Sequence, residues 1–306
     1  MIERPLISVV MLCYDHERYI AEALDGLLAQ SYAPLDIVVV DDCSPDRSAD
    51  IVRAKLTGYR GDARLVRRPY NKGLLGARET GFRAARGAFV VDTCDDDVMK
   101  PDMVAEMADA WQANNVSLVT ANAEYIDAES RPLGRTVRDC NNPADDSFET
   151  LARDGVNACC FGATIGVERA VYETFGMPPA HLANLDIMLP FYAYLLKGAC
   201  FIRKPLLKYR IHGRNGSLSL MAERSDGLEK LRVLERIHYG HLDHAVTMLH
   251  ELERAATIVP ERYAQLAPTI GPLLAIQTVE RAKKLVATRK ALWEAEQSGT
   301  GAGDRP

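Results

Sequence analysis

Two uninterrupted apolar segments, ISVVMLC at residues 7–13 and IVVV at residues 37–40, lie on either side of a helical pattern. Neither segment alternates apolar with polar residues, which is typical of strands that are covered on both faces of a sheet. The helical pattern occupies residues 17–30, where the apolar positions are Ile20, Leu24, Leu27 and Leu28. The spacing therefore predicts a strand, a helix and a second strand in succession.

The same alternation continues along the chain. Further helices are predicted over residues 46–56, 74–86 and 101–113, and further strands over residues 65–67, 88–92 and 116–121. This order favours an α/β fold with a mostly parallel sheet flanked by helices. Residues 127–157 are rich in Asp, Asn and Pro and are expected to form loops around a short helix. Helices are then expected over residues 168–175 and 185–196, and beyond Ser219.

The charge balance and the cysteine pattern exclude several classes of protein. The 306 residues include 37 Lys and Arg and 42 Asp and Glu, a net charge of −5, so a general nucleic-acid-binding function is not expected. No apolar run approaches the roughly 20 residues that a membrane-spanning helix needs. The N-terminus lacks the features of a secretory signal, and the 7 cysteines form no C-x-x-C pair. These features predict a cytoplasmic protein without a structural zinc site or a disulfide framework.

Polar clusters follow three of the predicted strands, at residues 14–17, 41–46 and 94–97. In open α/β sheets, ligands bind at the carboxyl ends of the strands. A helix cap or a solvated loop explains any one cluster alone. Three clusters at one edge would repel one another unless a cation or a ligand balanced their charge. Adjacent carboxylates suit Mg²⁺ or Mn²⁺, which often complete their coordination with phosphates, so a nucleotide is the expected partner.

The sequence contains neither the G-x-G-x-x-G dinucleotide fingerprint nor the G-x-x-x-x-G-K-[ST] phosphate loop, so a metal ion is expected to hold the phosphates. Several ordered motifs together resemble a family 2 inverting glycosyltransferase of the GT-A fold, over about residues 5–220. They are ISVVMLCYDHERYIAEALDGLLAQSY (7–32), VVVDDCSPDRSADI (38–51), YNKGLLGARETGFRAARGAFVV (70–91), CDDDVMKP (94–101) and YRIHGRNGSLS (209–219).

The resemblance implies a donor-binding role for several residues. Tyr14 and Asp15 stand where the family has a Tyr-Asn pair that lines the nucleotide pocket, so Asp15 departs from the usual Asn. Asp41 corresponds to the acidic residue that hydrogen-bonds the base, typically uracil. Asn71 and Arg78 fall in a segment that packs beneath the nucleotide. For Arg78, an ion pair with a neighbouring carboxylate is the structural alternative.

The run Asp95-Asp96-Asp97 resembles the D-x-D metal-binding motif. Cys94 stands where the first Asp of that motif is usual, whereas Asp96 and Asp97 match its final pair. A shifted register would use Asp95 and Asp96 instead. Because Asp96 belongs to both registers, it is the expected ligand of Mn²⁺ or Mg²⁺. Asp97 is expected to bind the metal or to position the sugar, and Asp95 to face the ribose or the metal.

The resemblance also implies residues on the acceptor side. Asp186 lies in the region where the family has its catalytic carboxylate, which removes a proton from the acceptor hydroxyl. A helix cap is the alternative for Asp186, and His181 is a weaker candidate for the base. His212 is expected near the diphosphate or the metal, with a buried structural histidine as the alternative. Arg210 and Arg214 are expected to offset charge on the leaving group.

Together with the resemblance, these residues predict a single displacement with inversion, from a nucleotide-sugar donor to a glycan or lipid-linked acceptor. The family pattern implies that the donor is a UDP-sugar. The Q-x-x-R-W motif of processive relatives is missing, so one sugar is expected per encounter. The alternatives are a nucleotidyltransferase, which would normally show an early Gly- and Lys/Arg-rich loop, and a catalytically inactive nucleotide-sugar-binding module. Donor hydrolysis would separate an enzyme from an inactive module.

The predicted domains are a GT-A domain at residues 1–220, a helical extension at residues 221–296 and a disordered tail at residues 297–306. The GT-A domain divides into a nucleotide-sugar half at about residues 1–122 and an acceptor half at about residues 123–220. Apolar stripes in the extension predict packing on the main domain or on a partner helix, as in a homodimer. Because the last helix is locally basic, peripheral attachment to the inner membrane face is the alternative.

Overall fold

The computed structural model describes residues 4–138, 147–154, 162–179, 182, 185–213, 222 and 225–300. The strands are β1 (Ile7–Cys13), β2 (Leu35–Asp41), β3 (Asp62–Arg67), β4 (Phe89–Cys94), β5 (Val98–Met99), β6 (Leu118–Ile126), β7 (Pro132–Thr136), β8 (Gly166–Glu168) and β9 (Ala199–Arg210). The helices are α1 (Ile20–Leu28), α2 (Ser48–Thr57), α3 (Gly73–Ala84), α4 (Met103–Asn114), α5 (Phe148–Asp154), α6 (Arg169–Phe175), α7 (Leu185–Leu196), α9 (Gly227–Ile258) and α10 (Pro260–Thr300).

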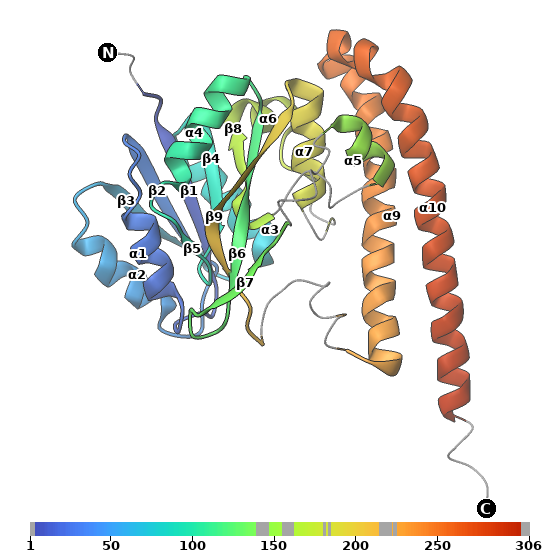
Figure 1. Cartoon of the computed structure of the whole chain (residues 1–306), viewed down its shortest axis with the longest axis horizontal. Coiled ribbons are helices and arrows are strands. Elements are labelled where there is room, and N and C mark those ends of the chain that lie inside the picture. Colours follow the sequence, from blue (N-terminus) through green and yellow to red (C-terminus); the bar gives the residue numbers. More distant parts are fainter. Residues whose placement is uncertain are drawn as a thin grey trace, which may run out of the picture. The chain divides into compact units, whose positions relative to one another are not determined.

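The strands form one mixed sheet in the order β3-β2-β1-β4-β8-β6-β9-β5, with β7 paired to β6 (Figure 1). Strands β3, β2, β1 and β4 run parallel to one another, and β6 is parallel to β9. Strand β8 is antiparallel to both β4 and β6, and β5 is antiparallel to β9. The α/β fold with flanking helices is therefore confirmed, and the first four predicted strands build a continuous parallel half of the sheet.

The central strand β1 is covered on both faces, which explains its uninterrupted apolar sequence. Val9 and Met11 belong to a core that also contains buried residues of α1, α2 and α4. Val10 points to the opposite face, toward α3. A Cβ atom at Gly81 would lie 2.2 Å from Cγ1 of Val10, so only glycine allows α3 to approach the sheet this closely.

The elements differ from the sequence-based prediction at several boundaries. Strand β7 lies within a segment that was expected to form loops, and its pairing with β6 explains why it is extended. Strand β6 continues to Ile126, five residues beyond the predicted end at residue 121. Helix α1 begins at Ile20 rather than residue 17, because the preceding residues form a turn in which the His16 carbonyl accepts the N–H groups of Tyr19 and Ile20.

Helices α5, α9 and α10 form a second compact unit, separate from the unit that contains the sheet. Helices α9 and α10 run antiparallel and side by side (Figure 1), joined by ion pairs between Arg232 and Glu296 and between Arg289 and Glu235. Helix α5, which was expected in the acceptor half, belongs to this unit. Helix α10 ends at Thr300. Among the described residues, none of the helices has the length and apolar character needed to cross a bilayer.

Candidate functional site

The carboxyl ends of β1, β2 and β4 lie next to one another at one edge of the sheet. The parallel register pairs Cys13 with Asp41 and Leu12 with Cys94. The three acidic loops that follow these strands therefore start from adjacent positions. Strand ends of this kind are where open α/β sheets bind their ligands, so the structure brings the three clusters together in the expected place.

The loop after β1 presents Tyr14 at the surface and turns sharply at Asp15. Tyr14 is 43% exposed, so its ring is accessible to a ligand. Asp15 has a φ of 56°, and its N–H donates to Oγ of Ser44 at 3.2 Å. Asn and Asp adopt this left-handed conformation more readily than other non-glycine residues. The presence of Asp15 in place of Asn is therefore compatible with the backbone of the turn.

The two carboxylates after β2 have different partners. Asp41 is fully buried and accepts hydrogen bonds from the N–H of Ser44 at 3.3 Å and from Nε of Arg67 at 3.2 Å. Asp42 forms an ion pair with Arg68, in which the nitrogen and oxygen are 2.7 Å apart. Asp42 therefore shapes the turn, and Asp41 is the carboxylate at the end of β2 that lies beside the loop of β1.

Asp95 connects the loop after β4 to the loop after β1. Its Oδ2 accepts the N–H of Tyr14 at 2.9 Å, and its Oδ1 lies 2.7 Å from Nδ1 of His16. The side chain of Asp95 is only 4% exposed. Burial raises the pKa of Asp95, and the contact with His16 opposes that rise. Both oxygens of Asp95 are thus engaged with the first loop.

Asp96 lies in a group of residues that could hold a metal ion. One ligand atom each from His16, Asp96 and His212 lies within 4.8 Å of the other two. These residues come from the loop after β1, the loop after β4 and the segment just after β9. Imidazole nitrogens and a carboxylate oxygen are a donor set that divalent transition metals accept in proteins, so of the two expected ions the residues fit Mn²⁺ better than Mg²⁺.

Asp97 lies outside this group and is held by Arg210. Its Oδ1 accepts the backbone N–H of Arg210 at 2.9 Å, while burial and the neighbouring Asp96 raise the pKa of Asp97 well above its usual value. The guanidinium of Arg210 donates to the backbone oxygen of Asp96 at 2.8 Å and to Glu22 at 2.7 Å. Its side chain is 1% exposed. The structure gives Arg210 the role of fixing the turn at Asp96 and Asp97, in place of the expected contact with a leaving group.

Arg78 and Asn71 have local partners in the structure. The guanidinium of Arg78 forms a buried ion pair with Asp92, which agrees with the structural alternative for this residue. The side-chain oxygen of Asn71 accepts the N–H of Gly73 at 2.7 Å at the beginning of α3. Asn71 is exposed, and Arg78 is buried.

Three residues singled out on the acceptor side are not fully described. His181 and Arg214 lie outside the described residues, and Asp186 is placed only as the second residue of α7. His16 was not singled out as a candidate metal ligand from the sequence. Its signal was its position, because it lies in the polar cluster directly after the first strand, two residues from Tyr14.

Two solved structures share this architecture. TarS 1–349 of S. aureus in complex with UDP-GlcNAc matches with a TM-score of 0.58 and 18% identity, covering 95% of this chain and 92% of that one. The mannosyltransferase PcManGT of Pyrobaculum calidifontis, in complex with GDP-Man and Mn²⁺, matches with a TM-score of 0.56 and 21% identity, covering 96% and 88%. The fold is therefore that of the GT-A class of glycosyltransferases.

The family follows from the sequence comparison. The model of Glycosyl transferase family 2 matches residues 8–176, more than half of the chain, and the protein belongs to this family. An uncharacterized glycosyltransferase of Nostoc sp. is 29% identical over 224 residues, covering 72% of this chain and 69% of that protein. The glycosyltransferase EpsJ of Bacillus subtilis is 34% identical over 116 residues, which is 38% of this chain and 33% of that protein. The protein is thus a glycosyltransferase.

One relative has a specific activity in its name. It is the UDP-Glc:alpha-D-GlcNAc-diphosphoundecaprenol beta-1,3-glucosyltransferase WfgD of Escherichia coli. That protein is 28% identical over 186 residues, covering 60% of this chain and 68% of its own length.

Proposed function

We propose that this protein is a non-processive, inverting and metal-dependent glycosyltransferase that moves a sugar from a UDP-sugar to a hydroxyl group of a glycan or lipid-linked acceptor. The observation that carries the proposal is the convergence of Asp96 with His16 and His212 at the carboxyl edge of the sheet. The neighbouring loops supply Tyr14 and Asp41, which are the residues expected to meet the nucleotide. Support for the donor class comes from TarS, whose structure was solved with UDP-GlcNAc.

In this proposal, Tyr14 stacks on the base, and Asp41 accepts a hydrogen bond from the base edge. In the structure, Nε of Arg67 lies 3.2 Å from the Asp41 carboxylate that would accept this hydrogen bond. The side chain of Arg67 is 51% exposed and can therefore turn away toward solvent. Asp15 and Ser44 fix the backbone that carries Tyr14. The proposed nucleotide site thus uses two loops that are already hydrogen-bonded to each other.

Asp96 would hold Mn²⁺ or Mg²⁺, and such an ion supplies positive charge where the diphosphate leaves. The Mn²⁺ complex of PcManGT supports this assignment. Asp97 positions the sugar in the proposal, because Arg210 holds its carboxylate beside Asp96. Asp186 removes the proton of the acceptor hydroxyl as the new bond forms, so that a single displacement inverts the anomeric carbon.

The test is calorimetric binding of UDP, GDP and dTDP with and without Mn²⁺, for the wild type and for Asp96→Ala. We expect metal-dependent binding of UDP that the variant loses. Release of free UDP from a UDP-sugar would then separate the enzyme from an inactive binding module. Release of pyrophosphate from a nucleoside triphosphate and a sugar phosphate would instead identify a nucleotidyltransferase. If none of the nucleoside diphosphates bound to the folded protein, the proposed donor site would be wrong.

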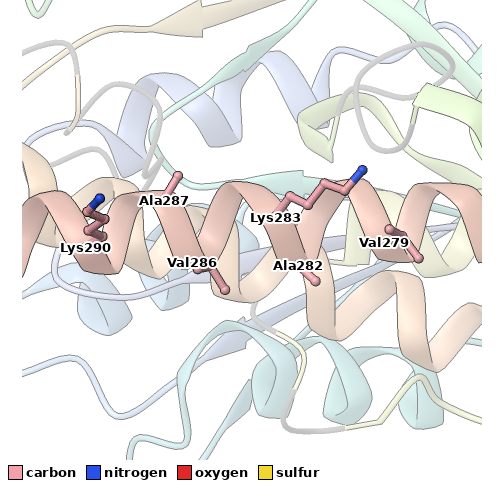
Figure 2. A pocket seen from close by; sticks show the side chains of 6 residues that line it. All are labelled: Val279, Ala282, Lys283, Val286, Ala287 and Lys290. Atoms are coloured by element: carbon pink, nitrogen blue, oxygen red, sulfur yellow. The ribbon is translucent and has the colours of Figure 1, made fainter.

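We also propose that α10 attaches the enzyme to an anionic membrane surface, where a lipid-linked acceptor would lie. Four large apolar side chains of α10 are exposed, namely Ile276 at 62%, Val279 at 54%, Val286 at 68% and Trp293 at 62%. Figure 2 shows Val279 and Val286 on the same stretch of helix as Lys283 and Lys290. At about 1.5 Å per residue, the stripe from Ile276 to Trp293 extends over roughly 25 Å.

The charge around this stripe favours lipid over a second copy of the chain. Residues 276–294 include five basic side chains, which are Arg281, Lys283, Lys284, Arg289 and Lys290. They include two acidic ones, Glu280 and Glu294. Positive charge beside apolar residues and a tryptophan is typical of a helix that lies in the interface of an anionic bilayer. Lys283 and Lys290 continue the three-and-four spacing of the apolar residues. In a parallel homodimer they would face their own copies and repel.

A further inference from the structure

We propose that His16 is a ligand of the catalytic metal ion and that Asp95 is the positioning residue that fixes its imidazole. The inference rests on the proposed metal-dependent function and goes beyond it, because it assigns two residues to roles that the D-x-D resemblance does not supply. The resemblance assigns the ion to the loop after β4, whereas His16 lies in the loop after β1. It also gives Asp95 a direct contact with the ribose or the metal.

The first argument is the convergence of three separate segments. His16, Asp96 and His212 each bring one ligand atom to within 4.8 Å of the other two. Ligand atoms that share one ion at about 2.1 Å are roughly 3 to 4 Å apart. The observed spacing therefore differs from a closed coordination site by a movement of about one ångström. A solvated acidic loop would not require histidines from two other segments at the same point.

The second argument is the contact that orients the imidazole. Oδ1 of Asp95 lies 2.7 Å from Nδ1 of His16, and Oδ2 accepts the N–H of Tyr14 at 2.9 Å. An imidazole that donates from Nδ1 to a carboxylate presents the lone pair of Nε2 for coordination. Metal-binding histidines in proteins are commonly held by a carboxylate in this way. Because Asp95 uses both oxygens to hold the first loop, it acts on the metal through His16.

The backbone of His16 is fixed as well. Its N–H donates to Oγ of Ser48 at 3.2 Å, and its carbonyl oxygen accepts the N–H groups at the beginning of α1. The ring lies against Tyr19 with the centroids 6.0 Å apart. A purely structural role for His16 would account for these contacts and for Asp95. It would not account for the approach of Asp96 and His212 to the same ring.

The set of ligand atoms also favours one metal ion over another. Mg²⁺ strongly prefers oxygen ligands, whereas imidazole suits transition metals. Two imidazoles and one carboxylate therefore favour Mn²⁺ over Mg²⁺. A site built only from carboxylates would not have this preference.

The test measures the nitrogen ligands of bound Mn²⁺ directly. Mn²⁺ is added to the full-length protein with UDP, and its affinity and the number of directly bound ¹⁴N nuclei are measured by pulsed electron paramagnetic resonance. The variants are His16→Gln, His212→Gln and Asp95→Asn. The matched control is His250→Gln, because His250 is an exposed histidine on α9 whose side chain is 74% exposed.

We expect two ¹⁴N couplings in the wild type and in His250→Gln, and one in each of the variants at positions 16 and 212. His16→Gln should bind Mn²⁺ about tenfold more weakly or worse, with a smaller preference for Mn²⁺ over Mg²⁺. Asp95→Asn should keep both couplings and lose about 10- to 100-fold in Mn²⁺ affinity, as is typical when the partner of a metal-binding histidine is changed.

The inference is wrong if His16→Gln retains every coupling and the wild-type affinity. It is also wrong if bound Mn²⁺ shows no nitrogen coupling in the wild type, and in that case the metal-dependent function stands with oxygen ligands alone. If UDP binds and Mn²⁺ does not, the metal dependence itself fails, and the role of His16 fails with it. Circular dichroism of each variant separates these results from loss of folding.

Discussion

Arg78 of α3 and Asp92 of β4 form an ion pair in which the two side chains are only 5% and 3% exposed. The resemblance had assigned Arg78 to a segment beneath the nucleotide. The pair joins a helix to the central part of the sheet, directly before the acidic loop that contains Asp96. Its first effect is therefore on the stability of the strand that carries the site.

Replacing Arg78 by methionine should destabilise the fold strongly. Removal of one partner leaves the other charge buried without its counterion, which typically lowers the free energy of unfolding by about 3 to 5 kcal/mol. Urea-induced unfolding measures the change. The control is Arg83→Met, because Arg83 pairs with Glu79 on the same helix but is 77% exposed. An exposed pair of this kind contributes about 0 to 1 kcal/mol, so equal effects of the two substitutions would contradict the prediction.

Asp186→Asn should abolish sugar transfer while donor binding is retained. General-base catalysis typically contributes about 10²- to 10⁴-fold to the rate, and asparagine cannot accept the proton. The measurement is the rate of transfer to an acceptor, together with the affinity for UDP in the presence of Mn²⁺. A helix-capping role would give a different result, since asparagine caps helices about as well as aspartate and the rate would stay near that of the wild type.

The helical unit should lose stability as the pH falls below neutral, because of His241. Burial, followed by the charges of Arg281, His244, His238 and Lys284, lowers the pKa of His241 from 6.5 to about 4. The neutral Nδ1 lies 3.4 Å from a guanidinium nitrogen of Arg281 on the facing helix. Between about pH 6.5 and pH 4 the unfolded chain binds a proton that the folded chain does not. The free energy of unfolding therefore falls across this window, by about 3 kcal/mol at most.

Hydrogen exchange of α9 and α10 at pH 7, 6 and 5 measures this loss of stability. His241→Gln removes the titrating group, so its exchange should depend less on pH than that of the wild type. His250→Gln changes an exposed histidine on the same helix and should leave the pH dependence as it is in the wild type. Identical pH profiles for the wild type and His241→Gln would show that another group is responsible.

The parts of the fold that follow from local pattern were predictable from the sequence. The apolar runs of β1 and β2 carry their own signal, because strands covered on both faces have no polar alternation. Strand β7 gives no such signal, since its residues PLGRT are mostly exposed and are extended only because they pair with β6. Likewise, nothing local indicates that α5 joins α10, where Nε2 of Gln277 donates to the carbonyl oxygen of Leu151 at 3.5 Å.

The candidate site shows the same division. The order of the motifs placed Asp41 and Asp96 at strand ends, because each belongs to a polar cluster that follows a predicted strand. The relation between His16 and Asp95 spans 79 positions and depends on the lateral order of β1 and β4, which the sequence does not display. Arg210 was assigned to the leaving group only because it lies in the YRIHGRNGSLS segment that carries part of the family resemblance. Its burial and its ion pair with Glu22 of α1 join positions 188 residues apart, which no local pattern displays.

The exposed stripe of α10 gives a prediction about membrane binding. The wild type should co-sediment with vesicles that contain an anionic phospholipid and should bind weakly to neutral vesicles. Val286→Ser with Trp293→Ser should reduce binding, because both side chains are more than 60% exposed and would insert into the interface. Lys283→Gln with Lys290→Gln should reduce binding to anionic vesicles only, and raised salt should have the same effect on the wild type.

The matched control for these variants is Tyr239→Ser with Val246→Ser on α9, where two exposed side chains of similar character, at 54% and 50%, lie outside the stripe. It should bind anionic vesicles as the wild type does. Sedimentation of the protein without vesicles measures whether the stripe binds a second copy of the chain. The membrane proposal is contradicted if the wild type is a dimer that does not bind vesicles, and if the double variant Val286→Ser, Trp293→Ser is a monomer. The stripe would then bind a second copy of the chain.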